Sequence, residues 1–282
     1  AEPHLEGPQG AFPLGREWPY TQWVYTYGPA GGINSNVVDM ARYARAQLRG
    51  GLDGKTLLSA ASLERLHTPH VYAGGASRQP AEGIAQVGRI SYCLGWIRQE
   101  MNPRPLVWHN GGTSGCKAVV GLVPDRDLAI VVLSNLGGTD LPEALMYRFY
   151  DLALGRPDQD YSGQFLKSSQ ARKQAMPVRP SPAQPPLPLE RYAGTYVNPL
   201  YGELTVSVAE QKLVAKLGST LRFDCLPWNR DTFRFDDFVN PTDPPQFLTF
   251  QVEPDGTVSA LESPSFGDGH GGVFQKRRTR TL

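Results

Sequence analysis

A dense run of prolines between residues 176 and 188 constrains the fold of this 282-residue chain more than any other feature. Proline fixes φ and lacks a backbone N–H, so repeated prolines can continue neither a helix nor the interior of a sheet. Segments of this composition are extended, semi-rigid spacers. The sequence therefore predicts two domains, over residues 1–175 and 189–282, with residues 176–188 as the linker between them.

Residues 1–175 alternate between helical and strand-like patterns. Capping residues predict a mostly buried helix that begins after Ser35 and ends at Gly50-Gly51. Similar signals predict two more helices, over residues 59–67 and 141–154. Apolar runs predict strands over residues 92–99, 106–109, 117–122 and 128–134. Because only a few residues separate these strands, they are expected to pair antiparallel, which gives an α+β domain.

Beyond the linker the pattern changes to short alternating segments separated by Gly, Pro, Asn and Asp. This pattern predicts a small antiparallel β-barrel or sheet. The expected strands cover residues 192–197, 203–209, 212–217, 232–235, 247–252 and 258–262.

Composition excludes several classes of function. The net charge is +1, with 28 basic and 27 acidic residues, so no chain-wide field would attract nucleic acid or an anionic membrane. No stretch approaches the ~20 apolar residues that a membrane-spanning helix needs. The three cysteines form no Cys-x-x-Cys pair, and a proline separates His67 from His70, so neither a metal nor a cofactor is expected.

The strongest chemical signal is the run Trp-His-Asn-Gly-Gly-Thr-Ser-Gly over residues 108–115. It follows an expected strand and precedes an expected hairpin. Glycines in such a position let a substrate approach the backbone closely. A backbone N–H beside them can provide half of an oxyanion hole. Taken alone, a histidine at the end of a strand is more often structural than catalytic.

His109-Asn110-Gly111 resembles the His-x-Gly form of the third motif of penicillin-recognising serine hydrolases, in the branch of class C β-lactamases, esterases and D-aminopeptidases. Residues 121–135 resemble the hairpin that follows this motif, and residues 29–42 resemble the family's glycine-rich start of a core helix. The resemblance covers roughly residues 1–155. It implies that this part is the C-terminal portion of a β-lactamase-like domain, with an antiparallel sheet and helices.

The resemblance also implies roles for five residues of the motif. His109 would assist proton transfer or orient the substrate, and the Gly112 N–H would be one oxyanion donor. Asn110, Gly111 and Thr113 would contact a small-molecule or peptide substrate, and Gly111 would leave room for it. Members of this family are usually periplasmic or secreted, so the same location is expected here.

The chain departs from the family in its nucleophile, which is the serine of a Ser-x-x-Lys motif at a helix N-terminus. Ser114-Gly-Cys-Lys117 matches this pattern, but it lies among glycines and strand residues. Tyr196-Val-Asn198 matches the family's Tyr-x-Asn motif but lies beyond the linker. We therefore expect the nucleophile to be missing and the chain to be inactive alone, with an N-terminal segment of the same protein as its partner.

Residues 189–282 resemble the lipocalin-like β-domain that is often appended to such hydrolases, through the run Leu-Glu-Arg-Tyr-Ala-Gly-Thr-Tyr that begins at Leu189. This leaves two interpretations of the chain. It is part of an acyl-serine hydrolase that acts on amide, ester or β-lactam bonds, or it is a non-catalytic module that binds a small molecule or a partner through the β-domain. Several apolar side chains of the β-domain could either line a ligand site or fill its core, and we expect them to fill the core. They are Leu217, Leu221, Phe223, Phe233, Phe235 and Phe247.

Overall fold

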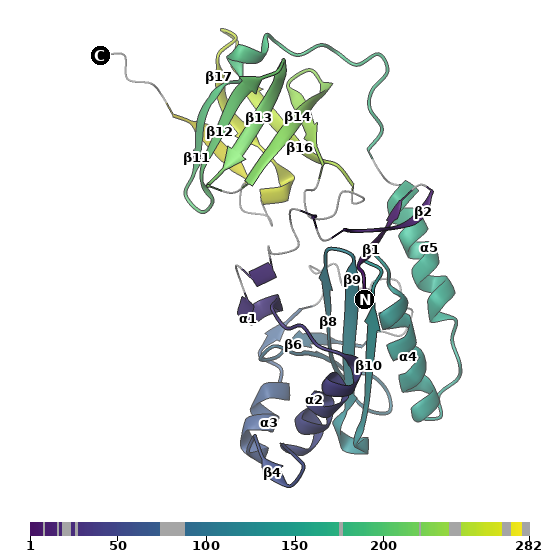
Figure 1. Cartoon of the computed structure of the whole chain (residues 1–282). Coiled ribbons are helices and arrows are strands. Elements are labelled where there is room, and N and C mark those ends of the chain that lie inside the picture. The colour runs from purple at the N-terminus through teal and green to yellow at the C-terminus, as the bar shows by residue number, and fades with distance from the viewer. Residues whose placement is uncertain are drawn as a thin grey trace. The chain divides into compact units, whose positions relative to one another are not determined.

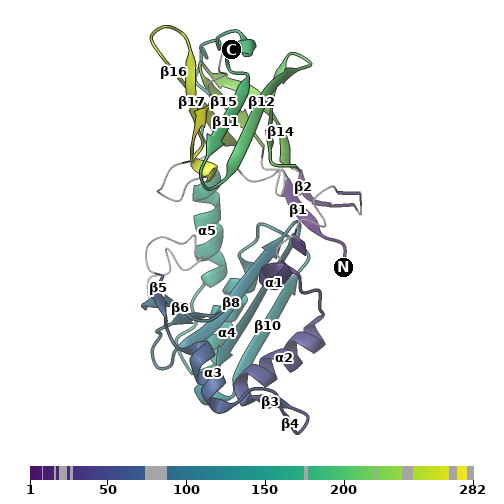
Figure 2. The same cartoon turned by 90° about the vertical axis from the view of Figure 1, so that its left-hand side faces the viewer.

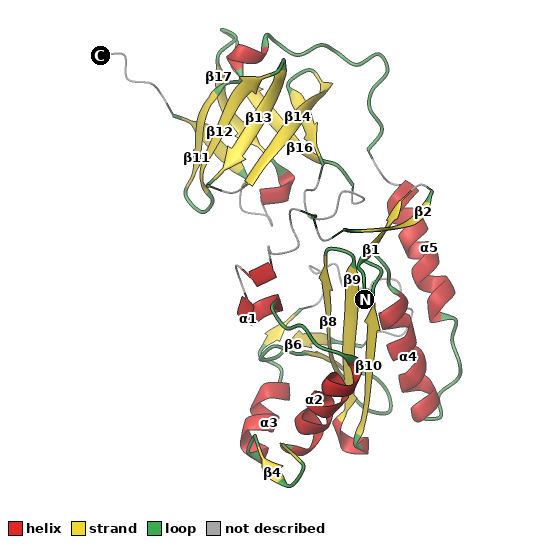
Figure 3. Ribbon diagram, viewed as in Figure 1, coloured by secondary structure: helices red, strands yellow, loops and turns green. Residues whose placement is uncertain are grey.

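The computed structural model describes residues 1–7, 9–15, 17–18, 24–25, 28–73, 88–174, 177–219, 221–236, 244–266 and 272–277. The chain divides into two compact units, Ala1–Gln174 and Ala175–Leu282 (Figure 1). The first unit combines helices with an antiparallel sheet, and the second is a closed antiparallel barrel (Figure 3). This is the α+β architecture that the sequence predicts.

The largest sheet of the first unit has the strand order β10-β9-β8-β7-β6-β5, and every neighbouring pair is antiparallel. Its strands are β5 (Val71–Tyr72), β6 (Ile90–Tyr92), β7 (Ile97–Gln99), β8 (Leu106–Thr113), β9 (Cys116–Val123) and β10 (Leu128–Ser134). Two small hairpins are β1 (His4–Gly7) with β2 (Gly10–Pro13), and β3 (Gly51–Leu52) with β4 (Lys55–Thr56). The helices are α1 (Gly28–Gly31), α2 (Val37–Arg49), α3 (Ala60–His67), α4 (Leu141–Ala153) and α5 (Tyr161–Gln174).

The sheet lies between two helical layers, with α2 and α4 on opposite faces (Figure 2). Side chains alternate between the faces along each strand. Trp108 of β8 therefore packs with Tyr147 of α4, while Val107 of the same strand packs with Ala44 of α2. Each side chain on β8 consequently faces either the α2 side or the α4 side of the sheet.

Helix α2 begins one residue later than the sequence predicts, because Asn36 and not Ser35 is the N-cap. The Asn36 side chain accepts hydrogen bonds from the backbone N–H groups of Val38 and Asp39. The expectation that the helix is mostly buried is also wrong, since Val38 is 66% exposed and Tyr43 is 42% exposed. Helices α3 and α4 agree with the prediction, whereas α5 has no clear apolar stripe and is not predicted.

The strand expected over residues 92–99 is in fact two strands, β6 and β7. A tight turn separates them, in which the Cys93 N–H donates to the Trp96 carbonyl and Gly95 adopts φ +76°. The turn reverses the chain, so β6 and β7 pair with each other as a short hairpin. An apolar run with a single glycine does not reveal such a reversal.

The second unit is a barrel in which each strand pairs with the next and the last pairs with the first. Its strands are β11 (Gly194–Asn198), β12 (Gly202–Ala209), β13 (Lys212–Leu217), β14 (Leu221–Asn229), β15 (Thr232–Phe235), β16 (Gln246–Val252), β17 (Val258–Glu262) and β18 (Val273–Lys276). Strands β14 and β18 are not predicted. The barrel removes the exposed strand edges that an open sheet of this size would have.

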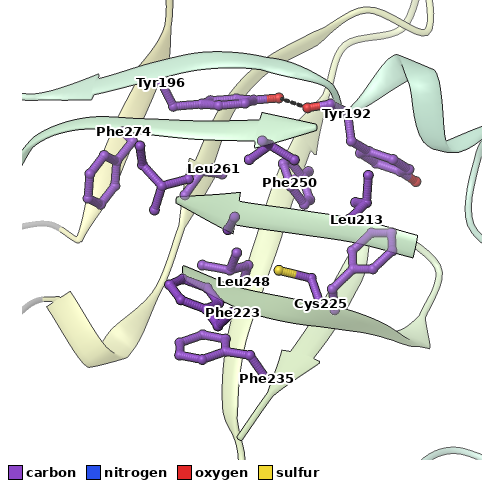
Figure 4. Close-up of a cluster of buried hydrophobic side chains, with 14 of the residues drawn as sticks. Tyr192, Tyr196, Leu213, Phe223, Cys225, Phe235, Leu248, Phe250, Leu261 and Phe274 are labelled. Carbon is purple, nitrogen blue, oxygen red and sulfur yellow. Dashed lines mark hydrogen bonds between the residues drawn. The ribbon is translucent and has the colours of Figure 1, made fainter. Parts of the chain in front are cut away.

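Aromatic side chains fill the interior of the barrel (Figure 4). Phe223 stacks on Phe235 with ring centroids 4.3 Å apart, and Phe233 meets Tyr192 edge to face. The Tyr196 hydroxyl donates to the Tyr192 carbonyl at 2.6 Å, so its polar end is satisfied inside the core. Burial raises the pKa of the Cys225 thiol to about 12, as expected in an apolar interior.

The proline-rich segment is attached to the barrel through backbone and side-chain hydrogen bonds. The Arg179 Nε donates to the Trp228 carbonyl at 2.7 Å, and the Leu187 N–H donates to the Tyr192 hydroxyl at 2.9 Å. The Gln184 N–H donates to the side chain of Asn229. This segment therefore belongs structurally to the second unit over much of its length.

The cap of α2 gives a test of the helix boundary. Asn36→Ala removes the acceptor of two helix N–H groups and should lower the free energy of unfolding of the first unit by about 1 kcal/mol. Ser35→Ala is the matched control, and its effect should lie within about 0.5 kcal/mol of zero. Urea denaturation followed by circular dichroism measures both, and an equal loss in the two variants would contradict Asn36 as the cap.

Candidate functional site

The second half of strand β8 is paired on one side only. Strand β9 pairs with β8 from Val107 to Thr113, whereas β7 pairs only with the three residues that end at Trp108. Within the described ranges, no strand pairs with the other edge of His109 to Thr113. The peptide groups along this edge are therefore placed to bind a substrate backbone or carbonyl.

The register determines which peptide groups face the unpaired edge. Thr113 and Cys116 flank a two-residue turn, so these two residues exchange their hydrogen bonds with each other. Peptide groups alternate in direction along a strand. Those of Gly111 therefore face β9, and those of Asn110 and Gly112 face the unpaired edge. The Gly112 N–H is thus directed away from the sheet, as an oxyanion donor requires.

Gly111 borders open space. A Cβ placed on Gly111 would have no described protein atom within 4 Å. A Cβ on Gly112 would make ordinary contacts of 3.8 Å with the Lys117 Cδ and the Cys116 carbonyl oxygen. The space above Gly111 lies on the same face of the sheet as His109 and Thr113, since these three residues alternate with Asn110 and Gly112.

His109 lies at the unpaired edge with a defined hydrogen-bonding pattern. Its Nδ1 is 2.5 Å from the Asn110 carbonyl oxygen, which can only accept, so Nδ1 carries the proton in the neutral ring. Its Nε2 is then an acceptor and lies 3.4 Å from the hydroxyl of Tyr92. The two rings meet edge to face at 6.0 Å.

Tyr92 is a member of this site that sequence reasoning missed. It belongs to β6, which is not paired with β8, and its side chain is 41% exposed. No motif in the chain connects Tyr92 to His109. The β6–β7 turn brings the two together, and that turn is the feature that the apolar run over residues 92–99 conceals.

Asn110 points to the opposite face of the sheet, toward α4. Its Nδ2 donates to the Glu143 Oε1 at 2.7 Å, and the Lys117 Nζ lies 3.0 Å from the same oxygen. The Glu143 side chain is fully buried, and that of Lys117 is 18% exposed. Only the backbone of Asn110 is therefore available at the unpaired edge.

The sequence matches to Ser-x-x-Lys and to Tyr-x-Asn lie in a turn and in a barrel strand. Ser114 lies in the turn between β8 and β9 and not at the start of a helix, and Lys117 is paired with Glu143. Tyr196 and Asn198 belong to barrel strand β11, where the Asn198 side chain caps the following turn.

The turn after β8 is held from outside by the N-terminal hairpin. The His4 N–H donates to the carbonyls of Gly115 and Asn135, at 3.0 and 2.8 Å. A Cβ on Gly115, which has φ +73°, would lie 2.7 Å from the Pro3 Cβ. The Asn135 Nδ2 donates to the Glu2 carbonyl at 2.9 Å, so this side chain also holds the N-terminal segment.

Neither a metal site nor a spanning helix is found in the described part of the chain. No three His, Cys, Asp or Glu side chains gather there in a way that could hold an ion. His67 packs edge to face on Trp96, and burial lowers the pKa of its imidazole. None of the described helices combines the length and apolar character needed to cross a bilayer.

The apolar side chains of the barrel contribute to packing. Phe223, Phe233 and Phe235 are at most 7% exposed and belong to its core cluster. Leu217 packs against that cluster, and Phe247 contacts Trp228 with ring centroids 5.1 Å apart. These positions favour a filled core over a ligand-binding interior.

Comparison with known proteins gives relatives for both units. A model described as a domain of unknown function, DUF3471, matches residues 178–271. "Unguisins hydrolase ungD'" from Aspergillus campestris (strain IBT 28561) is 28% identical over 270 residues, which cover 85% of this chain and 47% of that protein. "Unguisins hydrolase ungD" from Aspergillus violaceofuscus (strain CBS 115571) is 31% identical over 147 residues, 45% of this chain and 25% of that protein. The chain thus spans about half of the first relative and about a quarter of the second.

Among solved structures, an octameric penicillin-binding protein homologue from Pyrococcus abyssi is 15% identical with a TM-score of 0.43, over 98% of this chain and 53% of that one. The C-terminal domain of a penicillin-binding protein is 28% identical with a TM-score of 0.31, over 35% of this chain and 93% of that one. The beta-lactamase family model matches residues 2–154 of 282, which is more than half of the sequence and includes all of β8. The chain belongs to the beta-lactamase family.

Proposed function

We propose that this chain supplies the substrate-facing strand of an acyl-serine hydrolase that acts on amide, ester or β-lactam bonds. The observation that carries the proposal is the unpaired edge of β8, where the Gly112 N–H points away from the sheet beside His109. The attacking serine would come from a segment outside these 282 residues, because Ser114 lies in a turn and Lys117 is paired with Glu143.

The proposed reaction begins when the serine oxygen attacks the substrate carbonyl carbon and the carbonyl oxygen becomes negatively charged. The Gly112 N–H would donate to this oxygen, and one such donor is worth roughly 3 kcal/mol of transition-state stabilisation. The His109 Nε2 is positioned to accept a proton when the ring is neutral, and the Tyr92 hydroxyl next to it could pass one on. The bond from the carbonyl carbon to the amine nitrogen or alcohol oxygen would then break, and this leaving group would take up the proton that came from the serine. Water would attack the acyl-serine ester, which frees the carboxylic acid and restores the serine hydroxyl.

The substrate class is proposed from the site and from the curated relatives. A strand edge with outward N–H and C=O groups suits a peptide or another amide-containing molecule. Both curated relatives are named as hydrolases of unguisins, which supports hydrolysis as the reaction. As in many members of the family, we propose that the protein works in the periplasm or outside the cell.

The alternative function, a non-catalytic binding module, would depend on the barrel. The buried aromatic cluster that fills its interior leaves the hydrolase proposal better supported. Both functions can be separated by a reagent that reacts covalently with activated serines, because a binding module has none.

The first test compares the 282-residue chain with the same chain extended by the coding sequence that precedes it in its gene. With a fluorophosphonate probe, the extended protein should be labelled at one serine and the 282-residue chain should not. Mass spectrometry of the labelled peptide identifies the residue. Labelling at Ser114 of the 282-residue chain, or a folded extended protein that is never labelled, would contradict the proposal.

The second test addresses His109. His109→Ala removes the ring that accepts a proton at the unpaired edge, so the labelling rate of the extended protein should fall by about 10²- to 10⁴-fold. His70→Ala, at an exposed histidine outside the site, is the control and should leave the rate unchanged. Equal rates in the two variants would remove His109 from the mechanism.

The third test uses the open space above Gly111. Gly111→Val introduces a side chain that meets no described protein atom at its Cβ, so the thermal midpoint should stay within about 2 °C of the wild type. The same side chain would occupy the volume proposed for the substrate, and labelling by a bulky probe should slow far more than labelling by a small one. Unchanged rates for both probes would place the substrate elsewhere.

A further inference from the structure

A buried carboxylate lies behind the proposed oxyanion strand, on the face opposite to the substrate. Glu143 is in the first turn of α4, and its side chain is completely buried. Its Oε1 contacts two neighbouring strands at once, through the Asn110 Nδ2 of β8 at 2.7 Å and the Lys117 Nζ of β9 at 3.0 Å. One oxygen atom thus connects both strands of the hairpin to the helix.

The ion pair between Glu143 and Lys117 lies next to Gly112, on the α4 face of the sheet. Lys117 is the residue of β9 that pairs with Gly112, and its Cδ lies 3.8 Å from the point where a Gly112 Cβ would be. The aliphatic part of the Lys117 side chain therefore covers Gly112 on the α4 face of the sheet, and Glu143 binds the Lys117 ammonium group. Since glycine has no side chain to anchor it, the position of the Gly112 peptide depends on these neighbours.

Stability alone is a poor explanation for this arrangement. In many proteins the free energy needed to remove two charges from water exceeds the attraction between them. Well-packed apolar side chains in the same place often give equal or greater stability. The two partners of Glu143 belong to the two strands of the β8–β9 hairpin, so the carboxylate is better explained by what it positions.

We propose that Glu143 is a positioning residue for the reaction, which holds Asn110 and Lys117 so that the Gly112 N–H keeps its direction at the unpaired edge. The inference rests on the proposed function of β8. Glu143 touches neither substrate nor reacting atoms and acts through the two strands.

Asp151 provides a matched control on the same helix. Its side chain is also fully buried and is paired with one cation and one neutral donor, the Arg156 guanidinium at 2.8 Å and the Tyr161 hydroxyl at 2.7 Å. These partners do not belong to β8 or β9. Asp151→Asn and Glu143→Gln therefore remove equivalent buried charges, and only the second change affects the hairpin.

The experiment has two measurements. Hydrogen exchange of the 282-residue chain should show roughly tenfold faster exchange in β8 for Glu143→Gln than for Asp151→Asn, after correction for global stability. In the extended protein, the maximal rate of labelling by the fluorophosphonate probe, which phosphonylates the serine and releases fluoride, should fall by about 10- to 100-fold for Glu143→Gln, with little change in the half-saturating probe concentration. For Asp151→Asn the rate should remain within about twofold of the wild type.

The double variant Glu143→Leu/Lys117→Met keeps the test valid if Glu143→Gln fails to fold. It replaces the ion pair by apolar side chains, which should restore folding, but it leaves Asn110 without its acceptor, so labelling by the probe should stay slow. A folded variant at Glu143 with wild-type hydrogen exchange in β8 and a wild-type labelling rate would overturn the inference. Absence of labelling in the wild-type extended protein would instead overturn the proposed function, and the exchange measurement would still test whether Glu143 holds the strand.

Discussion

The antiparallel register between β8 and β9 is the constraint on which the rest of the site depends. The two-residue turn after Thr113 fixes which peptide groups of β8 face β9 and which face the unpaired edge. A shift of one residue would turn the Gly112 N–H into the sheet and move His109 to the α4 face. The chemistry proposed for this strand therefore follows from its pairing as much as from its side chains.

Separate parts of the fold maintain that register. Strand β1 binds the turn through the His4 N–H, and the positive φ of Gly115 lets the two segments approach closely. From helix α4, Glu143 holds Asn110 and Lys117. These contacts join residues that are 26 to 111 positions apart in the sequence, so the geometry of the edge is a property of the whole first unit.

The elements of this fold that depend on local sequence signals can be predicted from the sequence. The helices over residues 59–67 and 141–154 and the strand over residues 128–134 follow from local signals, and the structure agrees with them. The predictions fail where contacts with residues far away in the sequence determine the structure. The β6–β7 reversal and the exposed surface of α2 belong to this group, and so does the meeting of Tyr92 with His109. The motif predicts five residues of one strand but cannot show that Asn110 faces α4.

The most direct test of the account is a crystal structure of the extended protein after acylation by a substrate-like ester or amide. The acyl carbonyl oxygen should lie about 2.7–3.1 Å from the Gly112 nitrogen, with the acyl group over Gly111 on the His109 side of the sheet. An acyl oxygen bound by other donors, with the β8 edge left unused, would contradict the central claim.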